Sequence, residues 1–175
     1  QSPLIADKAW MKNVVHVVGA SDPALQSILD NYMNRYSDMI ADTLYGGNVN
    51  RFSKSSTEAV QQLSSDRISN LFHEGIGVLT YFGHSSTTTL QFNLDEPEAY
   101  NNPGKYPIFI ALGCNAGNFY TYNPLRFSYK TTLSEKFIFA PERGSIAFMA
   151  STHLGIVHYL DIYTTRLYNA LGNTK

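Results

Sequence analysis

Short apolar runs alternate with amphipathic segments along most of the chain. Five of the runs are flanked by glycine or polar residues, as is typical of buried strands. They lie at 13–18, 48–52, 77–82, 106–112 and 144–150. In the segments between and after them, apolar residues recur at helical spacing. The predicted helices cover about 23–43, 55–74, 132–140 and 160–171.

Capping residues mark several predicted helix ends. Asp22-Pro23 predicts an N-cap followed by proline at the first helical position. Ser55-x-x-Glu58 forms a capping box at the start of the second helix. Gly172 suits the end of the last helix. The apolar face expected for the second helix consists of Val60, Leu63, Ile68, Leu71 and Phe72.

The element order predicts an α/β fold. Strands that alternate with helices form a mostly parallel sheet with helices on both faces, and such strands are apolar almost throughout. The 175 residues suffice for one domain with one core. Because no repeat or linker interrupts the pattern, we expect residues 1–175 to form a single unit.

Composition excludes several classes of function. Hydrophobic residues make up 43% of the chain and charged residues 15%, as in folded globular proteins. The formal net charge of −1 provides no electrostatic attraction to nucleic acid. No apolar run approaches the length of a membrane-spanning helix. The single cysteine excludes an internal disulfide. The start at Gln1, without methionine or a signal-like segment, favours a processed product or an excised part of a longer protein.

Two residues with catalytic chemistry follow consecutive predicted strands. His84 and Cys114 each lie two residues past an apolar run. In parallel sheets, ligand sites lie at the carboxyl ends of the strands. If the two strands are neighbours, both side chains emerge at one edge. There an imidazole can activate a thiol as a nucleophile and later protonate the leaving amine, while backbone N–H groups near Cys114 and just after His84 stabilise an oxyanion.

Position alone leaves other roles open. Cys114 could be a small buried hydrophobe, and His84 a hydrogen-bonded structural residue. His153 and His158 lie past the fifth predicted strand, where they could line a pocket or bind zinc with His84 and Cys114, although the spacing matches no familiar zinc template.

The remaining candidates favour structural or surface roles. His16 lies inside the first predicted strand and His73 at a helix end, which favours structural roles for both. Asp95, Glu96 and Glu98 form an acidic loop, for which we expect solvated surface, with a divalent ion or a substrate contact as the alternative. The aromatic segment 118–129 is expected to cover a site or to pack against another subdomain.

Four segments, in order, resemble the gingipain-type cysteine peptidases, peptidase family C25. They are AWMKNVVHVVGA, GVLTYFGHSS, FIALGCNAGNF and GSIAFMASTHLG, and the resemblance spans about residues 9 to 158. It implies a caspase-like, three-layer α/β/α fold and a peptidase that needs no cofactor or metal. It assigns Cys114 as the nucleophile and His84 as the general acid and base.

The resemblance also implies roles for neighbouring residues, with departures. Ser85 stands where the family has glycine, and the resemblance assigns its backbone N–H, with that of Cys114, to the oxyanion. The acidic third member of the site corresponds to Asp22, which has a competing role as N-cap. The substrate pocket corresponds to Ser151, Thr152, His153 and Val157. Val157 replaces a tryptophan, and an acidic segment is missing, so a small or apolar substrate side chain is favoured over arginine.

The family implies a wider context as well. Its members are secreted or held at the cell surface, act on proteins or peptides, and carry a preceding α/β subdomain. One branch resembles sortases of type IX secretion, so transpeptidation is implied beside hydrolysis. No nucleic acid or membrane-spanning partner is expected. The alternative is an inactive module of this fold with a structural or binding role at the cell surface or in secretion.

Overall fold

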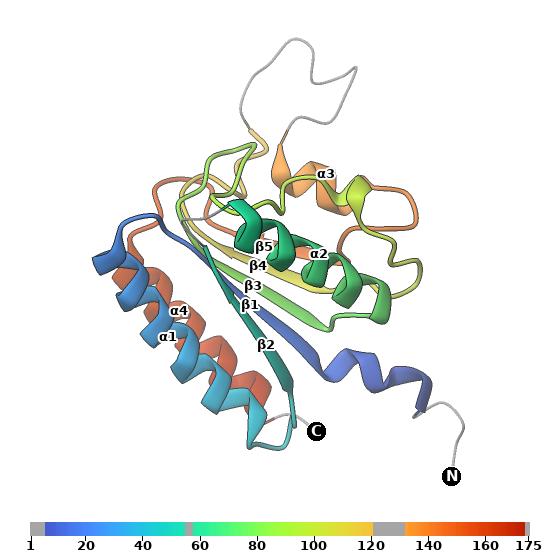
Figure 1. Ribbon diagram of the computed structural model, residues 1–175. Coiled ribbons are helices and arrows are strands. Elements are labelled where there is room, and N and C mark those ends of the chain that lie inside the picture. The colour runs from blue at the N-terminus through green and yellow to red at the C-terminus, as the bar shows by residue number, and fades with distance from the viewer. Residues whose placement is uncertain (1–5, 55–57, 121–131, 174–175) are drawn as a thin grey trace.

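The computed structural model describes residues 6–54, 58–120 and 132–173. Its centre is a five-stranded sheet in the order β2-β1-β3-β4-β5, and all of its strand pairs are parallel (Figure 1). The strands are β1 (Asn13–Gly19), β2 (Asn48–Ser53), β3 (Val78–Gly83), β4 (Ile108–Leu112) and β5 (Ala147–Ala150). The five strands predicted from sequence are confirmed, with small shifts at their ends.

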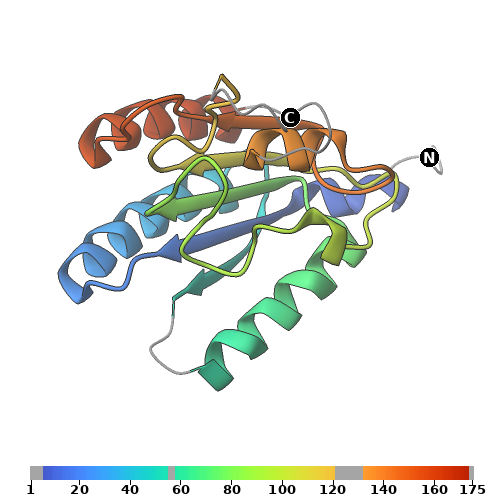
Figure 2. The ribbon, with the colours of Figure 1, turned by 90° about the horizontal axis from the view of Figure 1, so that it is seen from above.

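Four α-helices cover the sheet. They are α1 (Pro23–Ala41), α2 (Glu58–Glu74), α3 (Leu133–Phe139) and α4 (Val157–Gly172), and short 3-10 helices occupy Ala6–Lys12 and Pro97–Ala99. Figures 1 and 2 show α1 and α4 on one face and α2 and α3 on the other. The three-layer α/β/α fold predicted from sequence is therefore present. None of the described helices has both the length and the apolar character needed to cross a bilayer.

Consecutive strand residues pack on opposite faces of the sheet. In β3, Leu79 and Tyr81 pack with the α2 and α3 side, whereas Val78 and Phe82 pack with the α1 and α4 side. Strand β4 alternates in the same phase, since Leu112 packs with the α1 and α4 side. Both faces are buried at the centre of the sheet, which explains why β1, β3 and β4 are apolar at nearly every position. The edge strand β2 is more polar and is only partly buried.

The start of α1 agrees with its capping signal, whereas Gly172 is the last residue of α4 and Asn173 is the C-cap. Asp22 caps α1 by accepting a hydrogen bond from the Leu25 N–H at 2.8 Å. Ser55 of the predicted capping box lies outside the described residues. Leu63 was expected on the buried face of α2 but is 69% exposed. It lies nine residues before Phe72, about two and a half turns, and therefore on the opposite side of the helix.

His16 is a hydrogen-bonded core residue, as its position in β1 predicted. It is 1% exposed. Its Nδ1 lies 3.1 Å from Ser37 Oγ, and its Nε2 lies 2.7 Å from the Tyr168 hydroxyl, which contacts Thr80 Oγ1 at 2.6 Å. This chain of polar contacts joins α1, β1, β3 and α4. Burial lowers the pKa of His16 to about 3, so the ring is neutral at physiological pH.

The neutral His16 predicts a loss of stability in mild acid. Between its folded pKa, about 3, and an ordinary histidine pKa, the unfolded chain binds the extra proton, so stability falls as the pH decreases. From pH 7.5 to 5, His16 should account for about 2 kcal/mol of lost unfolding free energy. Urea unfolding of His16→Gln should show a pH dependence smaller by this amount. His73→Gln, which removes an exposed histidine, is the control, and equal pH dependence in all three proteins would contradict the prediction.

Candidate active site

The register of β3 and β4 brings the segments that carry His84 and Cys114 to the same edge of the sheet. Phe82 pairs with Leu112, and each candidate residue lies two positions past this pair. The His84 N–H donates to the carbonyl of Gly19, at the end of β1, at 3.1 Å. This bond extends the hydrogen-bond ladder between β1 and β3 beyond the last strand pair. His84 is exposed and Cys114 is half-buried. Both follow the strand ends at the same level and in the same alternation, which favours the α1 and α4 side for both.

Gly113 allows the two segments to approach closely just before Cys114. A Cβ at this position would lie 2.2 Å from Ser85 Oγ and 2.6 Å from the Gly83 carbonyl oxygen. Such distances leave no room for a side chain unless the backbone moves. The glycine before Cys114 is therefore required by close packing, because Gly113 is not among the residues with positive φ.

Ser85 links the histidine segment directly to the cysteine segment. Its hydroxyl donates to the Cys114 carbonyl at 2.7 Å. Ser85 also pairs with Leu90 in an antiparallel bridge and does not have a positive φ. Because any L-residue can adopt the backbone conformation at position 85, serine fits where the family that the sequence resembles has glycine.

The loop after β5 holds the other side of the Cys114 segment. Ser151 Oγ donates to the Gly113 carbonyl at 2.5 Å, and the Asn115 N–H donates to the His153 carbonyl at 2.8 Å. Asn115 has a φ of 57°, a left-handed conformation that asparagine tolerates better than most residues. The Gly155 N–H donates to Cys114 Sγ at 3.4 Å. The sulfur thus has a backbone donor beside it.

Two backbone N–H groups in these segments donate to no acceptor among the residues that the structure describes. Across the described part of the chain, neither the Ser85 N–H nor the Cys114 N–H donates a hydrogen bond. These are the two donors that the sequence resemblance assigns to an oxyanion. Unused donors at adjacent strand ends are what such a role requires.

Tyr81 is a site residue that sequence reasoning missed. Its hydroxyl donates to the His84 carbonyl at 2.5 Å and accepts from the Gln91 N–H at 3.0 Å. Burial raises the pKa of Tyr81 above its ordinary value, so the hydroxyl remains a donor. Gly19 makes room for the ring, because a Cβ there would lie 2.1 Å from the Tyr81 hydroxyl oxygen. The only signal in the sequence is a tyrosine three positions before the histidine.

Asp22 lies after the end of β1, next to the edge that carries His84. Its carboxylate is occupied by the N-cap bond to Leu25. Within the described residues, no hydrogen bond or ion pair joins Asp22 to His84. Its assignment as an acidic third member stays a prediction.

The predicted pocket residues divide between two hollows that flank β5. Ser151 lines a hollow of about 220 Å³ together with Met149, Leu160 and Tyr163. Thr152 lines a second one of about 490 Å³ on the α3 side. His153 is exposed, and Val157 begins α4 and packs against the core.

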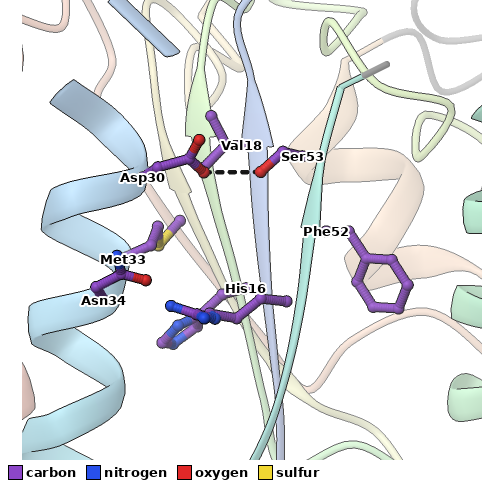
Figure 3. Close-up of a pocket in the computed structure, with 8 residues that line it drawn as sticks. His16, Val18, Asp30, Met33, Asn34, Phe52 and Ser53 are labelled. Carbon is purple, nitrogen blue, oxygen red and sulfur yellow. Dashed lines mark hydrogen bonds between the residues drawn. The ribbon is translucent and has the colours of Figure 1, made fainter. Parts of the chain in front are cut away.

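A third hollow, of about 360 Å³, lies between α1 and β2 and contains none of the predicted site residues. Figure 3 shows Asp30 and Met33 of α1 facing His16 and Ser53, with the Ser53 hydroxyl bonded to Asp30 at 2.7 Å. The His16 ring and the Asp30 carboxylate already have partners, and Asn34 and Arg51 also line this hollow.

The acidic loop is more structured than expected. Asp95 accepts a hydrogen bond from the Leu90 N–H at 2.6 Å, and burial raises its pKa to about 6. Glu96 pairs with Lys136 at 2.6 Å. Asp95 is therefore half-buried and anchors the hairpin that carries Ser85, whereas Glu96 and Glu98 are exposed, as expected. In the described ranges, no three His, Cys, Asp or Glu side chains gather into a group that could hold a metal ion. Residues 121–129, which make up most of the aromatic segment, lie outside these ranges.

Comparisons with known proteins identify the family and the fold. The sequence model described as peptidase family C25 matches residues 4–175. No curated protein sequence matches the chain.

Two solved structures show a similar fold. A crystal structure of the Arg-specific cysteine proteinase gingipain R has a TM-score of 0.61 at 18% identity, over 85% of this chain and 33% of that one. A complex of the pro- and mature domains of Porphyromonas gingivalis RgpB has a TM-score of 0.72 at 16% identity, over 97% of this chain and 39% of that one. The chain thus spans between a third and two fifths of the matched chains.

Removal of the Ser85 hydroxyl should loosen the Cys114 segment. Ser85→Ala leaves the Cys114 carbonyl without this donor, and the loss should lower the unfolding free energy by about 1 kcal/mol. Urea unfolding measures the change. Thr88→Ala, on the same hairpin but exposed, should have a smaller effect. An unchanged midpoint in Ser85→Ala would contradict the proposed link.

Two substitutions of Asp22 separate its capping role from a catalytic one. Asp22→Ala should lower the unfolding free energy by about 1 kcal/mol, whereas Asp22→Asn, a good N-cap, should not. We expect Asp22→Asn also to leave the rate of Cys114 alkylation unchanged. A clear fall in that rate at unchanged stability would instead identify the carboxylate as the third member of the site.

Proposed function

The chain belongs to peptidase family C25, and we propose that it is a cysteine peptidase in which Cys114 and His84 act as a pair. The observation that supports this most strongly is the common register of the two residues, together with the hydrogen bond from Ser85 to the Cys114 carbonyl. The family match alone identifies a peptidase fold. The pair supplies the nucleophile and the proton carrier that peptide-bond cleavage needs.

The proposed reaction has two steps. The Cys114 sulfur attacks the carbonyl carbon of the scissile peptide, and the thiol proton passes to His84. The C–N bond then breaks, His84 protonates the leaving amine, and a thioester remains on Cys114. Water attacks the thioester, His84 takes the proton of the water, and the acid product leaves with Cys114 restored as a thiol.

The two unused N–H groups of Ser85 and Cys114 are proposed to stabilise the oxyanion in both steps. Each belongs to backbone at the end of a core strand, so neither donor must reorganise when charge develops. An incoming amine in place of water would give transpeptidation by the same thioester, as in the sortase-like branch that the sequence resembles.

We propose that the substrate is a protein or peptide with a small or apolar side chain next to the cleaved bond. The hollow beside Ser151 is lined by Met149, Leu160 and Tyr163, together with alanine and leucine residues of the sheet, and by no charged side chain. An arginine side chain would find no charged partner there. This separates the chain from the Arg-specific gingipain R that shares its fold.

We also propose that this chain is the catalytic subdomain of a longer, secreted or surface-held protein. Two points support this proposal. The chain covers only 33% and 39% of the two matched chains. The family that the sequence resembles consists of secreted or surface-held proteins. The preceding α/β subdomain of such a protein is the proposed partner.

The second candidate function is a non-catalytic module with the same fold. It is favoured by the serine at position 85 and by the occupation of the Asp22 carboxylate in a helix cap. In this case, Cys114 and His84 would be relics of a catalytic pair, and Cys114 would react as an ordinary thiol.

Alkylation of Cys114 distinguishes the two functions. If the pair is active, iodoacetamide should modify Cys114 at pH 6 at least tenfold faster than a model thiol, because a neighbouring imidazole increases the thiolate fraction. His84→Ala should remove most of this advantage. His73→Ala, which changes a histidine at the distant end of α2, should not. Rates equal to those of a model thiol and unaffected by His84→Ala would contradict the peptidase function.

A further inference from the structure

The two backbone donors proposed for the oxyanion share an unusual feature. Each belongs to a peptide group whose carbonyl oxygen accepts a hydrogen bond from a side-chain hydroxyl. The Ser85 N–H shares its peptide with the His84 carbonyl, which accepts from the Tyr81 hydroxyl at 2.5 Å. The Cys114 N–H shares its peptide with the Gly113 carbonyl, which accepts from Ser151 Oγ at 2.5 Å.

A trans peptide is planar, so its N–H and C=O groups point in opposite directions. Anchoring of the carbonyl therefore orients the N–H of the same peptide. We propose that Tyr81 and Ser151 are positioning residues that orient the Ser85 and Cys114 N–H groups for the oxyanion. The inference rests on the function proposed above and adds the two residues that preorganise its donors.

The environment of Tyr81 is suited to this role. Its ring is fully buried, and its hydroxyl lies between three backbone groups, since it accepts from the Gln91 N–H at 3.0 Å and lies 3.4 Å from the Gly19 carbonyl oxygen. The Gln91 N–H also lies 3.1 Å from the His84 carbonyl. The His84–Ser85 peptide is thereby fixed from the interior of the protein, and its N–H is left for the exterior.

Ser151, which directly follows β5, fixes the second peptide, the one between Gly113 and Cys114. Its hydroxyl lies 2.5 Å from the Gly113 carbonyl oxygen and 3.1 Å from that of His153, and its own carbonyl accepts from the Gly117 N–H at 3.0 Å. These bonds tie the end of β5 to both sides of the Cys114 turn. Ser151, which the sequence suggested as a pocket residue, thus acts through the backbone of Cys114.

Two reagents separate positioning of these donors from reactivity of the thiol. Acylation of Cys114 by p-nitrophenyl acetate passes through a tetrahedral oxyanion, whereas alkylation by iodoacetamide is a displacement at a CH₂ group and forms none. In the full chain, Tyr81→Phe and Ser151→Ala should each slow acylation about tenfold. This effect is smaller than that of losing a whole oxyanion donor, because the N–H group itself remains. Alkylation should change by less than about twofold. Cys114→Ala provides the background rate of nitrophenolate release.

Matched controls exist elsewhere in the chain. Tyr45→Phe removes a tyrosine hydroxyl that donates to the Met11 carbonyl at 2.6 Å, and Ser65→Ala removes a serine hydroxyl that donates to the Gln61 carbonyl at 3.1 Å. Neither should slow acylation. Ser151→Thr keeps the hydroxyl and should restore most of the acylation rate that Ser151→Ala loses. The Ser151 variants decide the matter if Tyr81→Phe does not fold.

The outcomes distinguish this inference from the function on which it rests. If wild-type Cys114 alkylates rapidly but both variants acylate at the wild-type rate, the positioning role is wrong and the peptidase function stands. If alkylation falls in parallel with acylation, the hydroxyls support the loops in general and the proposal is overturned. If wild-type Cys114 reacts as an ordinary thiol with both reagents, the proposed function fails, and the inference fails with it.

Discussion

The parallel pairing of β3 with β4 is the constraint on which the candidate site depends. With Phe82 opposite Leu112, the two strands end at the same level, and the residues that follow them are neighbours. A shift of one residue would move one partner to the other face of the sheet, because side chains alternate along a strand. The register is held by the packing of alternate residues into the two helical layers, so the core determines where His84 and Cys114 emerge.

Beyond the strand ends, the backbone must find new hydrogen-bond partners. Buried carbonyl groups are costly when they are unpaired, and the sheet ladder no longer supplies donors. In this protein, side-chain hydroxyls take over that task, at His84 from Tyr81, at Gly113 from Ser151 and at Cys114 from Ser85. The same bonds that satisfy the backbone also hold the segments around the candidate pair. Stability and site geometry therefore have a common origin at this edge, and close contacts at Gly19 and Gly113 make it compact.

Much of the fold could be predicted from the sequence, because its signals are local. Apolar runs predicted all five strands, and Asp22-Pro23 predicted the start of α1. The placement of His84 and Cys114 just past the ends of two neighbouring strands followed from their positions after consecutive apolar runs. The helical spacing of apolar residues wrongly predicted that Leu63 is buried, since a helix that is covered on one side tolerates an exposed leucine on the other. The roles of Tyr81, Ser151 and Asp95 could not be predicted, because they depend on hydrogen bonds between loops whose conformations are set only by the finished fold. The resemblance to peptidase family C25 led to the correct family, whereas the departure at Ser85 could be understood only from its contact with Cys114.

The central claim is that His84 and Cys114 form a pair, and chemical cross-linking tests it most directly. 1,3-Dibromoacetone alkylates a reactive thiol and then bridges to an imidazole within its short reach, so the bridged peptides identify the partner. The account predicts that peptide mapping by mass spectrometry will find Cys114 joined to His84, and no bridge in His84→Ala. A Cys114 adduct that carries no bridge, or one joined to His153 or His158 in place of His84, would contradict it.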